Sequence, residues 1–171
     1  VVDLSFGGND DKAYMTGLPE GASIGSFGDA AWQREYRRRV GGVFDLVNRT
    51  GAHAIWIGLP QTSSANVTRR FDVLNAAVYA EARERPGRVT YLDTYTLFAG
   101  PDGGYAEYLA KPSGGSVKVR GDDGVHFEAI IVAPAFAGLA RVRRHQMVYA
   151  ALGSRMHEEI DALSMHTLSP E

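Results

Sequence analysis

The sequence contains no cysteine, which excludes disulfides, thiolate metal sites and a cysteine nucleophile. It also lacks an excess of either charge, since 18 Lys and Arg residues face 20 Asp and Glu residues. The resulting net charge of −2 gives no broad basic surface, and from it we expect no nucleic-acid partner. No apolar run reaches membrane-spanning length, so we also expect no membrane span.

The chain has no signal segment with a basic start, and its first residue is Val rather than Met, which is typical of a mature product or a fragment. Of its 171 residues, 44% are hydrophobic, enough for one substantial core. We therefore expect a single domain over residues 1–171.

Three short apolar segments predict buried parallel strands: Val1–Phe6, Gly51–Pro60 and Arg88–Thr94. Between them, apolar residues recur every three or four positions from Trp32 to Val47 and from Val67 to Val78, which predicts two amphipathic helices. Alternating strands and helices favour an α/β fold with right-handed crossovers and a parallel sheet covered on both faces, a three-layer sandwich.

The later part of the chain is less regular. The Gly-, Pro- and Ser-rich stretch Ala99–Arg120 predicts a long surface loop around a helical turn at Tyr105–Leu109. Pro134–Leu163 returns to a helical pattern that breaks near Gly153, and we expect the last few residues to fray.

A glycine pair and two polar residues follow the first predicted strand. In open α/β sheets ligands bind beyond the carboxyl ends of the strands, which is where Gly7 and Gly8 would leave room for a substrate. The amide of Asn9 could donate a hydrogen bond to an oxyanion there. The alternative is a simple turn in which Asn9 and Asp10 cap their own backbone.

A second polar group lies at Asp123 and His126, three residues apart. In a turn both side chains can project to one side, so that the carboxylate orients the imidazole and stabilises its charged form. We expect the neighbouring Asp122 to point elsewhere. The alternative is an acidic turn followed by a histidine that caps a helix.

Together these residues resemble the SGNH (GDSL-type) serine hydrolase superfamily, in particular a poorly characterised bacterial subfamily. Gly7-Gly-Asn-Asp10 matches its Gly-x-Asn-Asp block, and Asp123-Gly-Val-His126 matches its Asp-x-x-His block. The resemblance extends from Val1 to about Phe127 and includes Trp56-Ile-Gly-Leu-Pro60. It implies a flavodoxin-like three-layer fold, hydrolysis or transfer of acyl or acetyl esters such as those of cell-envelope carbohydrates, no cofactor, no metal, and a location in the periplasm or cell envelope.

By this resemblance His126 is the general base, Asp123 orients it, Asn9 is an oxyanion donor, and Gly7 and Gly8 border the substrate. The nucleophile is unknown, because the family's Gly-Asp-Ser block is absent from the sequence. Ser5, Ser26 and Ser116 match no family block. The resemblance therefore implies that this sequence lacks the family's nucleophile and its first two strands, and that the chain alone is inactive.

Three functional hypotheses follow. The favoured one is an SGNH esterase or acyltransferase domain without its nucleophile block. The second is a non-catalytic SGNH-like module that binds a glycan or a protein, with association through the exposed edge of Val1–Phe6. The third is a metal site for phosphoester chemistry, formed by a set of acidic and imidazole side chains: Asp10, Asp11, Asp122, Asp123 and His126. Trp32, Tyr36 and Trp56 fall on core-facing positions, and we expect them to be packing residues.

Overall fold

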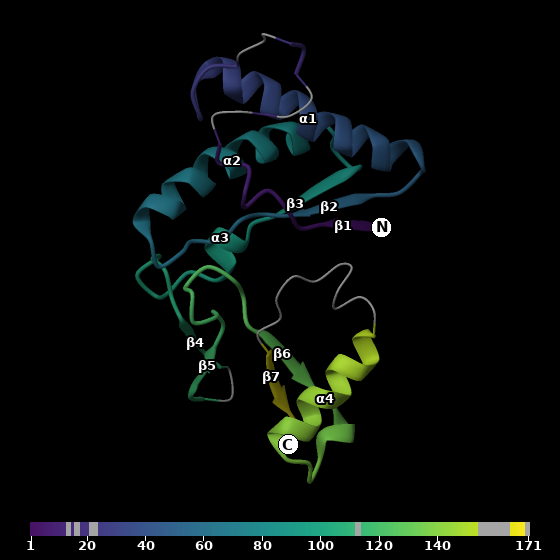
Figure 1. The fold of residues 1–171 in the computed structure, drawn as a ribbon, viewed down its shortest axis with the longest axis vertical. Helices are drawn as coiled ribbons and strands as arrows, with labels where there is room; N and C mark the ends of the chain where they lie inside the picture. Colours follow the sequence, from purple (N-terminus) through teal and green to yellow (C-terminus); the bar gives the residue numbers. More distant parts are fainter. Residues whose placement is uncertain (13–14, 16–17, 21–23, 112–113, 154–164, 170–171) are drawn as a thin grey trace. The chain divides into compact units, whose positions relative to one another are not determined.

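A computed structural model describes residues 1–171 except 13–14, 16–17, 21–23, 112–113, 154–164 and 170–171 (Figure 1). The chain divides into two compact units, Val1–Tyr105 and Ala106–Glu171. The expected single domain over 1–171 stays a prediction, and each unit is described by itself. Within the described residues, no helix is both long enough and apolar enough to cross a membrane.

The first unit is built on a parallel sheet of three strands, in the order β1 (Val2–Leu4), β2 (Ala54–Ile57) and β3 (Val89–Leu92). The register pairs Leu4 with Trp56 and Trp56 with Tyr91. All three strands lie within the apolar segments from which they were predicted. The α/β class with a parallel sheet is therefore confirmed.

Two long helices connect these strands, α1 (Ala30–Arg49) and α2 (Ala65–Arg83). Asp29 caps α1 by accepting a hydrogen bond of 2.9 Å from the backbone of Trp32, as its position before the apolar repeat predicts. Ser64 caps α2 in the same way. Both helices bury most of the apolar stripe that defined them in the sequence, whereas Val43, Val47 and Val67 are partly buried.

The two helices pack against each other on one face of the sheet (Figure 1). Phe44 of α1 contacts Trp56 edge to face, with ring centroids 5.6 Å apart. Tyr79 of α2 makes a similar contact with Tyr91 at 5.5 Å, and Trp56 and Tyr91 are paired neighbours in the sheet. Because both crossovers return over the same face, the third layer of the expected sandwich is not confirmed.

The core of this unit lies between these helices and β2. Trp32, Phe44, Trp56 and Leu74 are almost completely buried, and Tyr36 is 6% exposed. The three aromatic residues expected to be packing residues are thus buried. The short helix α3 (Thr94–Leu97) follows β3, with Asp93 as its N-cap.

The second unit begins with an antiparallel hairpin, β4 (Tyr108–Ala110) and β5 (Ser116–Lys118). The helical turn expected at Tyr105–Leu109 is therefore wrong, and Ser116 lies in a strand rather than a loop. The cause is the glycine pair Gly114-Gly115, whose positive φ angles of 91° and 77° allow the chain to reverse and pair.

The remainder of this unit consists of β6 (Ala129–Val132), the 3₁₀ turn η1 (Pro134–Phe136), α4 (Arg141–Leu152) and β7 (Met165–Leu168). β6 and β7 pair in parallel, and Phe136, Val148 and Met165 form a small buried core. α4 ends at Gly153, where the helical pattern was expected to break. Neither strand was predicted, and the end of the expected helix, 154–163, lies outside the described residues.

Candidate functional site

The first part of the candidate site is the turn that follows β1. Gly7 has a φ of 109°, and the backbone N–H of Asp10 donates to its carbonyl oxygen at 2.8 Å. A Cβ atom on Gly7 would lie 3.2 Å from the hydroxyl oxygen of Tyr36. Glycine is therefore needed here both for the backbone conformation and for the close approach of α1.

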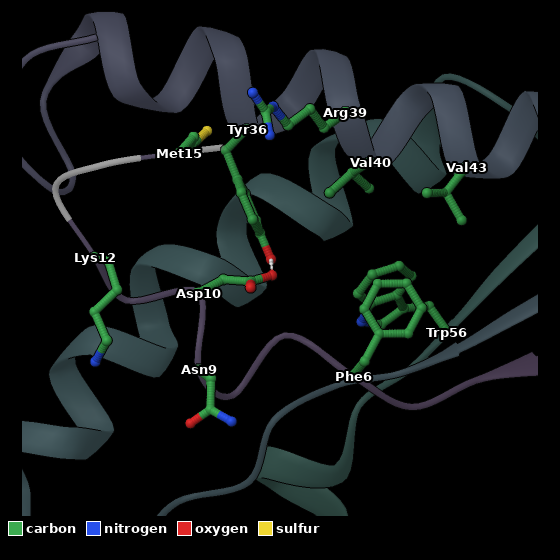
Figure 2. Close-up of a pocket in the computed structure, with 10 residues that line it drawn as sticks. All are labelled: Phe6, Asn9, Asp10, Lys12, Met15, Tyr36, Arg39, Val40, Val43 and Trp56. Carbon is green, nitrogen blue, oxygen red and sulfur yellow. Dashed lines mark hydrogen bonds between the residues drawn. The ribbon is translucent and has the colours of Figure 1, made fainter. Parts of the chain in front are cut away.

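Tyr36 connects α1 to this turn. Its hydroxyl donates a hydrogen bond of 3.0 Å to Oδ2 of Asp10 (Figure 2). Burial, followed by the nearby charge of Asp10 and this hydrogen bond, raises the pKa of Tyr36. The phenol therefore stays protonated and remains a donor at physiological pH.

The residues after Asp10 are tied to both helices. The indole N–H of Trp32 donates to the carbonyl oxygen of Lys12 at 2.7 Å. Asp11 forms ion pairs with Lys12 and with Arg70 of α2. Although burial opposes the shift, the hydrogen bonds and charges of these two cations lower the pKa of Asp11.

A cavity of about 440 Å³ opens between α1 and the end of β1 (Figure 2). Its apolar wall includes Phe6 and Trp56, whose rings make an edge-to-face contact at 4.5 Å. The complete lining combines this wall with polar groups: Phe6, Asn9, Asp10, Lys12, Met15, Tyr36, Arg39, Val40, Val43 and Trp56. In Figure 2 the exposed Asn9 side chain points away from Tyr36. The cavity can hold an apolar group beside charged and amide groups.

The second part of the candidate site is the pair Asp123 and His126. Nδ1 of His126 lies 2.6 Å from Oδ2 of Asp123. The other carboxylate oxygen accepts backbone hydrogen bonds from Val125 at 2.8 Å and from His126 at 3.0 Å. The side chain of His126 is 75% exposed. The carboxylate is thus held by the loop and fixes one ring nitrogen, which leaves the other side of the ring accessible.

The electrostatics of this pair follow from the same contacts. The hydrogen bond from His126, followed by the backbone hydrogen bonds from Val125 and His126, lowers the pKa of Asp123 to about 2. Asp122 forms an ion pair with Lys118 instead, so its side chain points elsewhere, as expected. The carboxylate next to the imidazole therefore stays charged across the physiological range.

The loop that carries the pair has a defined conformation. The backbone N–H of Gly121 donates to the carbonyl oxygen of His126 at 2.8 Å, and Gly124 turns the chain with a φ of 68°. Next to it, the fully buried Arg120 stacks on the ring of Phe127, with its guanidinium carbon 4.1 Å from the centroid. The local backbone, rather than a helix, brings the two side chains together.

Asn9 with Gly7 and Gly8 belongs to the first unit, while Asp123 and His126 belong to the second. The structure brings Asp123 and His126 into contact, but the assembly of all five residues into one site stays a prediction. The metal hypothesis gains no support from the described part of the chain, where no three His, Cys, Asp or Glu side chains gather in a position to hold a metal ion.

Several residues of the cavity were missed by the sequence analysis. Arg39, Val40 and Val43 line it together with Tyr36. They follow Tyr36 by three, four and seven residues, which places all four along one side of α1. That spacing was a usable signal. Lys12 and Met15 carried no such signal in the sequence, because they lie outside the helices and strands.

Comparison with known proteins separates the two ends of the chain. The family described as "Protein of unknown function (DUF459)" matches residues 1–130, and the family of BolA-like proteins matches residues 110–171. The DNA-binding transcriptional regulator BolA of Haemophilus influenzae is 37% identical over 46 residues, which are 27% of this chain. The chain spans 45% of the length of that relative. The Asp123–His126 loop lies where the two family matches overlap.

These matches correct one expectation. Nucleic acid was excluded as a partner because the net charge is close to zero, but a relative of the C-terminal part is named a DNA-binding regulator. The exclusion is therefore wrong, because net charge averages over a chain whose two ends resemble different families.

The description of the N-terminal family states no activity, so the SGNH assignment is not confirmed. Its match nevertheless covers well over half of the sequence, from Val1 through the Asp123–His126 pair. The chain therefore belongs to the DUF459 family.

Proposed function

We propose that the DUF459 region is an ester-hydrolysing domain of the SGNH type, in which His126 is the general base and Asp123 its orienting partner. The hydrogen bond of 2.6 Å between Nδ1 of His126 and Oδ2 of Asp123 carries this proposal. It is supported by the match to a family that is associated with SGNH-like hydrolases. An orienting carboxylate of this kind selects the tautomer whose Nε2 can accept a proton.

In the proposed reaction, Nε2 of His126 takes the proton of a serine hydroxyl as the serine oxygen attacks the acyl carbonyl. The side-chain amide of Asn9 donates to the resulting oxyanion, which in such sites contributes about 3 kcal/mol. The imidazolium then gives its proton to the leaving alcohol, and water releases the acyl group by the same steps. The substrate class is an acyl or acetyl ester of a small alcohol or a glycan.

The serine itself is the missing component. The sequence has no Gly-Asp-Ser block, and no serine in it matches another block of the family. We propose that residues outside these 171 supply the nucleophile and that the chain alone turns over little ester. A location in the cell envelope, which the resemblance implies, stays a prediction.

The test is to extend the chain upstream with the Gly-Asp-Ser segment of a family member and to measure hydrolysis of para-nitrophenyl acetate. His126→Ala and Asp123→Asn should each lower kcat/KM, His126→Ala by roughly 1,000-fold. His53→Ala is the matched control. It also removes an imidazole, but one that is hydrogen-bonded to Thr90 of the sheet and is not part of the proposed site. Equal rates for His126→Ala and the parent would refute the assignment, and no turnover in any form would favour a binding module.

Nucleic-acid binding by the second unit is a second candidate function. The match of residues 110–171 to BolA-like proteins, and the printed name of the Haemophilus relative, favour it. α4 begins with Arg141, Arg143 and Arg144 within four positions. Arg144 donates to the carbonyl oxygens of Leu139 and Thr167, so it serves the fold of the unit, whereas Arg141 and Arg143 are exposed.

This candidate is tested by the fluorescence anisotropy of a labelled DNA duplex over a range of salt concentrations. The double variant Arg141→Ala/Arg143→Ala should weaken binding. The slope of log K against log salt should become less steep by the amount expected for the loss of about two phosphate contacts. Lys12→Ala is the control, since it removes a cation from the other unit. Absence of salt-dependent binding by the parent chain would exclude this function.

A further inference from the structure

A second cavity, of about 430 Å³, lies within the first unit between α2 and the carboxyl end of β3. Its lining consists of aromatic, acidic and amide side chains: Asp72, Asn75, Ala76, Tyr79, Tyr91, Asp93 and Tyr95. Its size falls within the range of small-molecule sites. No residue of this lining belongs to the proposed ester-hydrolysing site.

The tyrosines provide electron-rich surfaces. Tyr79 and Tyr91 meet edge to face with centroids 5.5 Å apart. The guanidinium carbon of Arg83 lies 5.9 Å from the ring centroid of Tyr79, a geometry that allows a cation–π contact. Burial and then the charge of Asp93 raise the pKa of Tyr91, so its hydroxyl stays protonated. Tyr91 is therefore neutral and presents an uncharged ring to the cavity, while the Tyr79 ring already has Arg83 over it.

The carboxylate of Asp93 is held in place by its neighbour Thr96. Asp93 accepts hydrogen bonds from Thr96, through its backbone N–H at 3.2 Å and its hydroxyl at 2.7 Å. Burial, followed by the nearby charge of Asp72, raises the pKa of Tyr95. Among the lining residues there is no Lys, Arg or His. The lining thus carries two negative charges and no positive one.

The rest of the wall is held by hydrogen bonds and close packing. Asn75 holds the backbone of Leu59 on both sides, accepting from its N–H at 2.8 Å and donating to its carbonyl oxygen at 2.7 Å. A Cβ atom on Gly58 would collide with the hydroxyl of Tyr91. The glycine therefore leaves the space in which Tyr91 sits, and the cavity has a preformed shape.

We propose that this cavity binds a small organic ammonium ion, with Asp72 and Asp93 balancing its charge and the tyrosine rings contacting its alkyl groups. An ammonium ion with alkyl substituents is weakly hydrated and suits a wall that combines carboxylates with aromatic faces. A divalent metal fits less well, because only two carboxylates line the cavity and Asp93 already accepts hydrogen bonds from Thr96. This site goes beyond the proposed ester hydrolysis and does not depend on it.

The test uses the whole chain, with choline as the probe and its neutral isostere 3,3-dimethylbutan-1-ol as the comparison. Binding is followed by NMR of the tyrosine ring protons and by titration calorimetry. Choline should shift the signals of Tyr79, Tyr91 and Tyr95 and bind at least about tenfold more tightly than the isostere.

Variants locate the binding site. Asp72→Asn and Tyr79→Leu should each weaken choline binding at least about fivefold. Asp93→Asn removes the charge but keeps a residue suited to the N-cap of α3. A loss of choline binding in this variant therefore reports the loss of charge rather than unfolding. The matched control is Asp3→Asn, which removes an exposed carboxylate from β1 and should leave binding unchanged.

Equal affinity for choline and the isostere would overturn the proposal, because the cavity would then be only apolar. Binding of neither probe would also overturn it. So would displacement of choline by millimolar MgCl₂ or CaCl₂ at constant ionic strength, since that result would assign the carboxylates to a metal. None of these outcomes bears on the role of His126, so the two proposals fail independently.

Discussion

The hydroxyl of Tyr36 donates to the carboxylate of Asp10 at 3.0 Å, which fastens the middle of α1 to the turn that follows β1. Tyr36→Phe removes this bond and should lower the free energy of unfolding by about 1 kcal/mol. Urea unfolding followed by tryptophan fluorescence measures the change, because Trp32 and Trp56 both belong to the first unit. Tyr149→Phe, on the exposed side of α4, should leave that transition unchanged.

Two adjacent glycines of α1 give a matched pair of substitutions. A Cβ atom on Gly42 would meet nothing within 4 Å, whereas one on Gly41 would lie 2.9 Å from side-chain atoms of Arg85 and Glu81. Gly42→Ala should therefore stabilise the first unit by about 1 kcal/mol through helix propensity. Gly41→Ala should stabilise the unit less, because the ion pair of Arg85 with Glu81 must move to make room for the added methyl group.

Thermal unfolding of the two variants under the same conditions measures this difference. Equal stabilisation by both substitutions would show that α2 does not pack against Gly41 as the structure has it.

The acid titration of Asp123 reports its contact with His126. Its pKa of about 2 lies below the ordinary 3.8, so the folded loop favours the ionised form. The stabilisation is therefore complete above pH 3.8 and is lost as the pH falls towards 2. His126→Ala should raise the pKa of Asp123 towards 3.8, as measured by the NMR shift of its carboxyl carbon.

Glu35 is the internal control for that titration. Its pKa is also about 2, but the lowering comes from Arg38 and Arg39 on α1. It should not change in His126→Ala. If the pKa of Asp123 stayed near 2 in the variant, the backbone donors alone would hold the carboxylate and the orienting contact would be in doubt.

Features with local causes were predicted best from the sequence. α1 and α2 follow from their apolar spacing, and α1 also from its Asp29 cap. Asp123 reaches His126 because the two lie three positions apart in one turn. The pairing of β6 with β7 could not be predicted, because residues far apart in sequence form it around a small core. The hairpin was missed because its Gly-Pro-Ser composition was interpreted as an unpaired loop.

The cavities show the same limit. Tyr36 was expected to be a packing residue, and Tyr79, Tyr91 and Asp72 were assigned to no site. Tyr79, Tyr91 and Asp72 line one cavity because α2 packs against β3, which brings together residues that are not adjacent in sequence. The exclusion of nucleic acid as a partner was wrong for a different reason, because net charge says nothing about which family a segment resembles.

The central claim is that His126, held by Asp123, activates a serine that these 171 residues do not supply. Intact mass spectrometry after treatment with a fluorophosphonate probe tests it most directly, on this chain and on the chain extended with a Gly-Asp-Ser segment. We predict one adduct on the serine of the added segment, lost in His126→Ala, and none on the 171-residue chain. An adduct on the 171-residue chain, or labelling of the extended chain that is independent of His126, would contradict the claim.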